Sequence, residues 1–249
     1  MNAGLRKKIM LLGSSMTERS FSLEYHGWGA AMSNWYARSA DVLNRGAGGY
    51  NSKWLRKCLP VLLGNEIPDM AVLFIGNNDA VQEGGEQHVP LVEYKANIIA
   101  ILEHLHNVNN DMAVLLISTT RVNEHMKPNS KDARRRRYTE VLRFIHRNRA
   151  RPEILDCGDL PQSMALVDLW GGDSCNDSVL AARLDKYSIT ADDLHDGSHL
   201  NISGNKKMFH AIKDTINSEF PHLSPDFNQP PTLRTKRTSS SDLKGMGGM

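Results

Sequence analysis

The sequence predicts an α/β fold, in which helices cover both faces of a five-stranded parallel sheet. Three observations support this. Five short apolar segments alternate with longer segments of helical periodicity. The apolar segments are hydrophobic at nearly every position, which is typical of parallel strands buried on both faces. The 249 residues, 40% of them hydrophobic, suffice for one substantial core, so we expect a single folded domain.

The first half of the chain contains two strand–helix pairs. Residues 9–12, Ile-Met-Leu-Leu, form a short apolar run typical of a buried strand. Residues 28–39 carry apolar side chains at roughly helical spacing and predict a helix, and residues 40–44 predict the next strand. A second helix is expected over residues 52–63, where Gly64 ends the pattern.

The second half repeats this alternation. Residues 70–75, Met-Ala-Val-Leu-Phe-Ile, predict the most clearly buried strand. Residues 90–106 predict a long amphipathic helix, and residues 112–118 predict the fourth strand. A further helix is expected over residues 131–147, and residues 164–170 predict the fifth strand.

The chain is expected to end in a helix followed by a tail. Ser203 opens the last predicted helix, which extends to about Phe220. Beyond it Pro, Ser, Lys and Gly dominate, and residues 223–249 have too few apolar side chains to offset the entropy cost of ordering them. We therefore expect a folded domain over residues 1–222 and a disordered tail over residues 223–249.

The composition argues against several classes of protein. The 30 basic and 28 acidic residues leave a formal charge of only +2, which does not indicate a nucleic-acid-binding protein. No apolar run approaches the roughly eighteen residues of a membrane span. Cys58, Cys157 and Cys175 are too few and too scattered to predict a disulfide framework or a zinc site. We expect a soluble cytoplasmic protein, and its oligomeric state, including a homodimer, stays open.

Ser15 is the first candidate for a functional residue. It follows the strand at 9–12 and Gly13, whose backbone freedom allows a sharp turn. In open α/β sheets ligands bind at the carboxyl ends of the strands, so a hydroxyl placed there is a candidate nucleophile. The alternative is that Ser14 and Ser15 only cap the helix that follows.

Asp196 and His199 supply the groups that would activate such a hydroxyl. They are three positions apart in a loop that precedes the last helix. This spacing lets the Asp196 carboxylate reach the His199 imidazole, hold its tautomer and stabilise its charged form while the other ring nitrogen faces a serine. Asp192 or Asp193 is the alternative partner of His199.

Hydrogen-bond donors for a developing oxyanion are expected from three loops. The segment Gly76-Asn77-Asn78-Asp79 and the glycine cluster at 45–51 each follow a predicted strand. The cluster does not match the G-x-G-x-x-G pattern of dinucleotide-binding loops. Amides of the Ser15 and Gly46 loops and the side-chain NH2 of Asn78 could supply three donors to an oxyanion, and one such donor is typically worth about 3 kcal/mol of barrier.

Four blocks of the sequence resemble the signature blocks of the SGNH, or GDSL-type, hydrolases, in the same order. They are Gly-Ser-Ser-Met-Thr-Glu at 13–18, Asn-Arg-Gly-Ala-Gly-Gly-Tyr-Asn at 44–51, Gly-Asn-Asn-Asp-Ala at 76–80 and Asp-Gly-Ser-His-Leu-Asn-Ile-Ser-Gly-Asn at 196–205. Residues 27–31 and 88–97 are similar to the branch of isoamyl acetate-hydrolysing esterases. The resemblance covers about residues 8–220.

The resemblance implies a flavodoxin-like three-layer α/β/α sandwich that hydrolyses carboxylic esters without a metal or an organic cofactor. It implies that Ser15 is the nucleophile, that His199 is the base and that Asp196 orients it. Ser15, Gly46 and Asn78 would form the oxyanion hole. The expected partner is a small ester, such as an acetate ester, hydrolysed through an acyl-Ser15 intermediate.

Two features depart from the family pattern. Ser14 occupies the place of the family's aspartate and lacks its charge-assisted contacts, so the Ser15 loop is expected to be held less firmly. Residues 121–125 lack the proline-rich character of the branch. These departures motivate an alternative function, a catalytically impaired protein that binds esters or glycans in the same cleft. A true Gly-Asp-Ser at residues 172–174 is interpreted as fortuitous, because no intervening family block follows it before Asp196.

Other conspicuous residues are interpreted as solvated or structural. Successive residues of a helix point around its whole circumference, so most of Arg134–Arg137 are expected in solvent, and RNA binding through them is the less favoured alternative. His195 stands one position before Asp196 and is expected on the loop surface. His26 is expected to pack within the fold, with a place in the lining of the cleft as the alternative.

Overall fold

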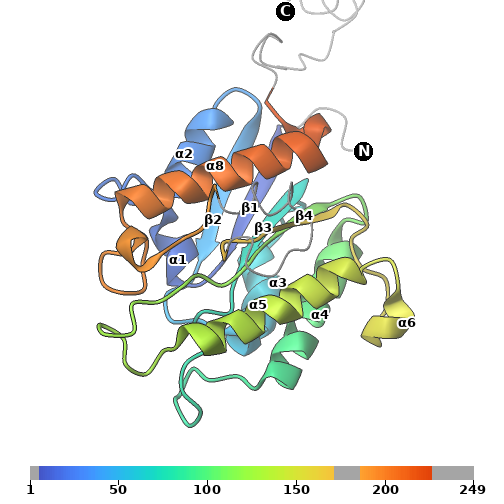
Figure 1. Ribbon diagram of the computed structural model, residues 1–249. Coiled ribbons are helices and arrows are strands. Elements are labelled where there is room, and N and C mark those ends of the chain that lie inside the picture. The colour runs from blue at the N-terminus through green and yellow to red at the C-terminus, as the bar shows by residue number, and fades with distance from the viewer. Residues whose placement is uncertain (1–5, 171–185, 226–249) are drawn as a thin grey trace, which may run out of the picture.

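The computed structural model describes residues 6–170 and 186–225, and a parallel sheet forms the centre of the described chain (Figure 1). Its strands pair in the order β2-β1-β3-β4-β5, and every pairing is parallel. This is the flavodoxin-like order of a doubly wound sheet, so the predicted fold class is confirmed. The strands are β1 (Lys7–Gly13), β2 (Ala40–Gly46), β3 (Met70–Phe74), β4 (Ala113–Ile117) and β5 (Met164–Val167).

Helices cover both faces of this sheet and complete the three layers. Helices α2 and α8 lie on one face, and α3, α4 and α5 lie on the other (Figure 1). The α-helices are α1 (Ser15–Glu18), α2 (Trp28–Trp35), α3 (Ser52–Leu63), α4 (Leu91–Val108), α5 (Asp132–Arg147), α6 (Pro152–Leu155) and α8 (Ile202–Glu219). Short 3-10 helices are η1 (Arg19–Phe21), η2 (Ala191–Asp193) and η3 (Pro221–Leu223).

The packing of the core explains why the strands are continuous apolar runs in the sequence. Successive side chains of a strand point to opposite faces. Leu11 of β1 packs in the cluster that contains Trp28 of α2. Its neighbour Met10 packs in the other cluster, with Leu55 of α3. Because helices cover both faces, each strand position needs an apolar side chain, and all four of these residues are fully buried.

The register of the central strands brings three loops to one level. Gly13, at the end of β1, pairs with Gly46 at the end of β2. On its other side Gly13 pairs with Phe74 at the end of β3. The chain therefore leaves three adjacent strands at the same edge of the sheet, which is where doubly wound folds bind their ligands.

Two predicted elements are shorter than expected. The helix predicted over 28–39 ends at Trp35, because the amides of Ser39 and Ala40 both donate to the Tyr36 carbonyl and turn the chain into β2. The strand predicted over 164–170 ends at Val167, and beyond it the Leu169 amide leaves the ladder and donates to the Ser118 hydroxyl.

Some predictions fall on residues that the structure does not describe. The Gly-Asp-Ser at 172–174, Cys175 and residues 226–249 of the expected tail lie outside the described ranges. Within them, Leu223 is 8% exposed and packs in the core, so the packed region extends past the predicted boundary at 222. Over residues 6–170 and 186–225, no helix combines the length and the apolarity that crossing a membrane requires.

Candidate active site

Ser15, His199 and Asp196 form a hydrogen-bonded chain at the carboxyl edge of the sheet. The Ser15 hydroxyl lies 2.8 Å from Nε2 of His199, although the two residues are 184 positions apart in the sequence. Nδ1 of His199 lies 2.7 Å from Oδ2 of Asp196. The other carboxylate oxygen of Asp196 accepts hydrogen bonds from the amides of Ser198 (3.0 Å) and His199 (2.8 Å). The imidazole is therefore oriented with one nitrogen toward the hydroxyl.

The turn that presents Ser15 requires a glycine before it. A Cβ at Gly13 would lie 2.2 Å from the Phe74 carbonyl oxygen and 2.4 Å from Oγ1 of Thr17, closer than a side chain tolerates. Helix α1 then begins at Ser15. The Ser14 side chain caps no amide of this helix, so the alternative that the two serines serve only as caps is wrong.

The protonation states of the pair suit a general base. Burial lowers the pKa of His199, and the hydrogen bond and negative charge of Asp196 oppose part of that shift. Burial alone would raise the pKa of Asp196, but hydrogen bonds from the His199 amide and ring and from the Ser198 amide hold it well below its usual range. At neutral pH the ring is therefore neutral and the carboxylate is charged.

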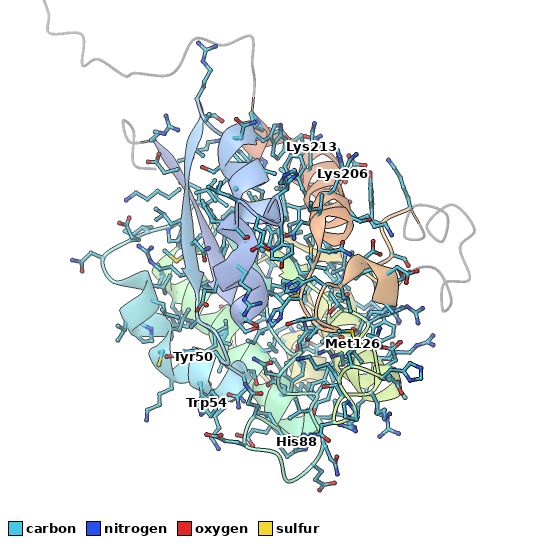
Figure 2. All side chains as sticks on the ribbon, turned by 90° about the vertical axis from the view of Figure 1, so that its left-hand side faces the viewer. Tyr50, Trp54, His88, Met126, Lys206 and Lys213 are labelled. Atoms are coloured by element: carbon cyan, nitrogen blue, oxygen red, sulfur yellow. The ribbon has the colours of Figure 1, made fainter. Side chains whose placement is uncertain are left out.

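Asn78 lies in the loop after β3, and one of its two side-chain N–H groups has no acceptor within the part of the chain that the structure describes. Its Nδ2 donates to the Tyr50 carbonyl at 2.8 Å, and the side chain is partly exposed, whereas the neighbouring Asn77 is 4% exposed. An amide NH2 carries two hydrogens, so the second one is available to a ligand. Tyr50 and its neighbour Trp54 lie in the lower half of Figure 2, as do His88 and Met126.

Gly46 allows β2 and α1 to pack closely beside the site. A Cβ on this residue would lie 2.0 Å from the Glu18 amide nitrogen, so only glycine allows β2 to approach α1 this closely. The Gly46 amide donates to Oδ1 of Asn44 at 2.9 Å. It could reach an oxyanion only by breaking that bond, which the sequence could not indicate.

The next amides of the same loop differ in whether they already donate to an acceptor within the protein. The Ala47 amide donates to the Gly13 carbonyl at 2.9 Å, and the Gly48 amide donates to Oε2 of Glu18 at 2.6 Å. Among the described residues, the Gly49 amide has no acceptor. Gly49 is therefore the residue of this loop whose amide is free to bind a ligand.

The two alternative partners do not bind His199. Asp192 is exposed, and over the described residues its carboxylate forms no hydrogen bond or ion pair with the ring. Asp193 is 2% exposed and binds Lys207 (2.7 Å) and the Ser203 hydroxyl (2.8 Å). Asp196 is the carboxylate that holds His199.

Two histidines do not lie where the sequence placed them. His195 was expected on the loop surface but is half-buried, because its ring stacks on Tyr25 with centroids 4.2 Å apart and planes 9° from parallel. His26 was expected to pack but is exposed, at a backbone φ of 49° that follows from the tight turn before α2.

The comparisons with known proteins agree with this geometry. A model of the GDSL-like lipase/acylhydrolase family matches residues 11–207. The chain belongs to this family. A GDSL esterase/lipase of Arabidopsis thaliana is 32% identical over 242 residues, which cover 89% of each chain. Hydrolysis of carboxylic esters, the activity that defines GDSL esterases, is thereby the activity of this enzyme.

A further relative and a solved structure are also similar to this GDSL hydrolase. The isoamyl acetate-hydrolyzing esterase 1 homolog of Homo sapiens is 39% identical over 126 residues, which cover 48% of this chain and 50% of that protein. A solved structure of an Axe2 mutant, an acetyl-xylooligosaccharide esterase from Geobacillus, has a TM-score of 0.60 at 18% identity and covers 88% of this chain and 98% of its own. That second likeness concerns the fold alone.

Sequence reasoning missed a buried residue beside the candidate site of the GDSL enzyme, Arg135. Most of the run Arg134–Arg137 was expected in solvent, but Arg135 is 2% exposed and lies inside the fold. Its guanidinium donates to the Arg121 carbonyl (3.0 Å) and to the hydroxyl of Ser198 (3.0 Å), the residue before His199. Burial lowers its pKa to about 10, so the cation persists at neutral pH. The helical spacing alone could have singled out one inward-facing member of the run.

The loop at residues 121–125 of this hydrolase contacts the loop that precedes α8. The Asn123 amide donates to the Gly197 carbonyl at 2.9 Å. Met126, labelled in Figure 2, approaches so closely that a Cβ on Gly197 would lie 2.7 Å from its Cβ. Substitutions in this loop therefore act directly on the segment that carries Asp196 and His199.

Proposed function

We propose that the enzyme hydrolyses small carboxylic esters through an acyl-Ser15 intermediate. The observation that carries this proposal is the hydrogen-bonded chain from Ser15 through His199 to Asp196, at 2.8 and 2.7 Å. Nε2 of His199 takes the hydroxyl proton while the Ser15 oxygen attacks the carbonyl carbon. The imidazolium then protonates the leaving alcohol, and Asp196 stabilises its charge.

The second half of the reaction reverses these roles. Water enters, His199 removes its proton, and the hydroxide attacks the acyl carbon. The Ser15 oxygen leaves as the acid is released, and His199 returns the proton to it. The hydroxyl thus ends the cycle as it began, without a metal or an organic cofactor.

The oxyanion of both tetrahedral intermediates needs donors at the same edge. We propose the Ser15 amide and the second N–H of Asn78 for this role, together with an amide of the loop after β2. Gly46 was expected to supply that amide, but its bond to Asn44 favours Gly49 instead. Removal of a side-chain donor typically costs about 3 kcal/mol of barrier, so Asn78→Ala should lower kcat by roughly 10²-fold.

A small acyl group is the substrate class that the relatives support. The name of one of them, the isoamyl acetate-hydrolyzing esterase 1 homolog, refers to an acetate ester. In a chain-length series of p-nitrophenyl esters, we expect the highest kcat/KM for acetate or butyrate. A maximum at long acyl chains would contradict this assignment.

The nucleophile is tested by covalent labelling. A fluorophosphonate probe should label the wild-type enzyme and fail to label Ser15→Ala, because the probe reacts with an activated serine hydroxyl. Ser14→Ala is the matched control, since it removes the adjacent hydroxyl and leaves the hydrogen bond between Ser15 and His199 intact. Equal labelling of Ser15→Ala and wild type would eliminate Ser15 as the nucleophile.

The sequence also left open a catalytically impaired protein that binds esters or glycans, and membership of a family of ester hydrolases argues against this alternative. The alternative is favoured by Ser14, which is 2% exposed and caps no amide of α1, where the family's aspartate would add charge-assisted contacts. We expect wild type to be active, because the catalytic groups are already within hydrogen-bond distance, and Ser14→Asp to change kcat less than about tenfold. A wild type that is silent to the probe and gains turnover in Ser14→Asp would favour the binding protein.

A further inference from the structure

His195 has no part in the proposed mechanism, yet the fold holds it beside the catalytic histidine. Its ring stacks on Tyr25, and its centroid lies 5.9 Å from that of the His199 ring, with the planes 24° apart. Within residues 6–170 and 186–225, neither ring nitrogen of His195 has a hydrogen-bond partner; only its backbone amide is engaged, donating to the His199 carbonyl. An imidazole without a hydrogen-bond partner among those residues is therefore held in place beside the His199 ring.

His195, Asp196 and His199 together form a set of metal-ligating side chains. Each offers one ligand atom, and these atoms lie within 4.8 Å of one another. All three side chains are partly exposed, so an ion from solvent can reach them. Two imidazoles and one carboxylate are a donor set that suits Zn²⁺.

The geometry requires only a small adjustment around an ion. Bonds of about 2.0–2.2 Å in a tetrahedral site place neighbouring ligand atoms roughly 3.4 Å apart. The three residues share one short loop, and their ligand atoms already lie within 4.8 Å of one another, so changes of roughly 1.4 Å or less in these distances reach that separation. Ordered ligands favour binding: Tyr25 restrains the His195 ring, and two backbone amides hold Oδ1 of Asp196.

We propose that His195, Asp196 and His199 form an inhibitory site for Zn²⁺. Both ring nitrogens of His199 are engaged, one with Ser15 and the other with Asp196. A metal ion that binds either nitrogen displaces one of these partners, and the chain that activates the Ser15 hydroxyl is broken. Only the inhibition rests on the proposed function, because the binding of Zn²⁺ depends on the ligands alone.

The test compares wild type with His195→Phe. Phenylalanine keeps the stack on Tyr25 and removes the nitrogen ligand, so the basal rate with p-nitrophenyl acetate should not change. Loss of an outer-shell partner alone typically lowers metal affinity by roughly 10- to 100-fold. We therefore expect the Zn²⁺ inhibition constant of His195→Phe to rise at least about tenfold, and EDTA to restore the wild-type rate.

Matched controls separate this site from other histidines. His222 is exposed in η3, beyond the opposite end of α8, so His222→Phe should leave Zn²⁺ inhibition unchanged. Mg²⁺ prefers all-oxygen ligands and should not inhibit. Equal Zn²⁺ inhibition of wild type and His195→Phe, or equal inhibition by Mg²⁺, would overturn the proposal.

Calorimetric titration with Zn²⁺ distinguishes a failure of this proposal from a failure of the proposed function. Ser15→Ala keeps the three ligands, so it should bind Zn²⁺ at least as tightly as wild type while having no esterase activity. Wild type could bind Zn²⁺ but hydrolyse no ester, while His195→Phe binds no Zn²⁺. That result would support the metal site and contradict the proposed mechanism. Undiminished Zn²⁺ binding by His195→Phe overturns the metal site whatever the activity.

Discussion

Two adjacent serines at the end of β1 differ completely in their surroundings. Ser14 is 2% exposed, and its side chain caps no amide of α1. Ser15, one position later, places its hydroxyl 2.8 Å from Nε2 of His199. Ser14 is the N-cap residue and Ser15 is the first residue of α1, so the backbone directs the two side chains differently. The backbone, more than the residue type, makes one of these hydroxyls a candidate nucleophile.

The pKa of His199 sets the expected acid limit of activity. Burial lowers this pKa, and Asp196 opposes part of the shift. The rate should therefore fall, as pH decreases, with an apparent pKa below the usual 6.5, because the protonated ring cannot act as a base. Asp196→Asn removes the opposing charge, so the acid limb should move to still lower pH while kcat falls by roughly 10²- to 10⁴-fold.

The measurement is kcat/KM for p-nitrophenyl acetate over a series of buffers from about pH 4 to 8. Asp192→Asn is the control, since Asp192 is exposed and, over the described residues, forms no hydrogen bond or ion pair with the His199 ring. An acid limb that moves upward in Asp196→Asn would show that the carboxylate does not stabilise the charged imidazole.

At the scale of elements, α5 carries an arginine run whose members differ in role. Arg136 and Arg137 are exposed and Arg134 is half-buried, whereas Arg135 is buried against the loop that follows β4. Arg135 donates to the Thr120 hydroxyl at 3.3 Å and to the Arg121 carbonyl at 3.0 Å. The face of the helix therefore decides which arginine supports the site and which ones are solvated.

Arg135→Ala should weaken both the fold and turnover. It leaves buried acceptors without a donor, which costs about 2–4 kcal/mol of unfolding free energy. It also frees the Ser198 hydroxyl, so kcat should fall roughly tenfold or more as the catalytic loop loses its support. Denaturant unfolding and steady-state kinetics measure the two effects.

Arg136→Ala is the matched control from the same run. Arg136 is exposed, so its replacement should change the unfolding free energy by less than about 0.5 kcal/mol and leave kcat unchanged. Equal effects of the two substitutions would contradict the structural distinction between these residues.

At the scale of the whole molecule, Asp79 should make stability depend on pH. It is fully buried, and burial raises its pKa to about 6, although both carboxylate oxygens accept from the Ser52 amide. Because the folded state binds this proton more tightly than the unfolded state, the contribution of Asp79 to stability is lost as pH rises from about 4 to 6. The loss is on the order of 3 kcal/mol, from a shift of about two pKa units.

Asp79→Asn removes this titration. The variant should match wild type in unfolding free energy near pH 4 and exceed it by up to about 3 kcal/mol near pH 7. Denaturant titrations at a series of pH values measure this difference, with the exposed Asp192→Asn as control. A difference between Asp79→Asn and wild type that does not vary with pH would refute the assignment.

The whole fold also explains why distant segments meet. The loops after β1, β2 and β3 leave adjacent strands at one edge, and the loop before α8 returns to the same edge with His199. The family and ester hydrolysis follow from the comparisons. The cytoplasmic location, the homodimer and the absence of a nucleic-acid partner stay predictions.

The sequence by itself determined the order and type of the main elements, because strands buried on both faces must be apolar throughout and amphipathic helices must repeat at helical spacing. It also indicated Ser15, which follows a predicted strand and a glycine, and Asp196 and His199, which are three positions apart in one loop. Only the tertiary structure decided that Gly46 donates to Asn44, that Arg135 lies inside, and that His195 stacks on Tyr25. Those contacts depend on how closely packed segments approach one another, and a local pattern of residues does not encode that distance.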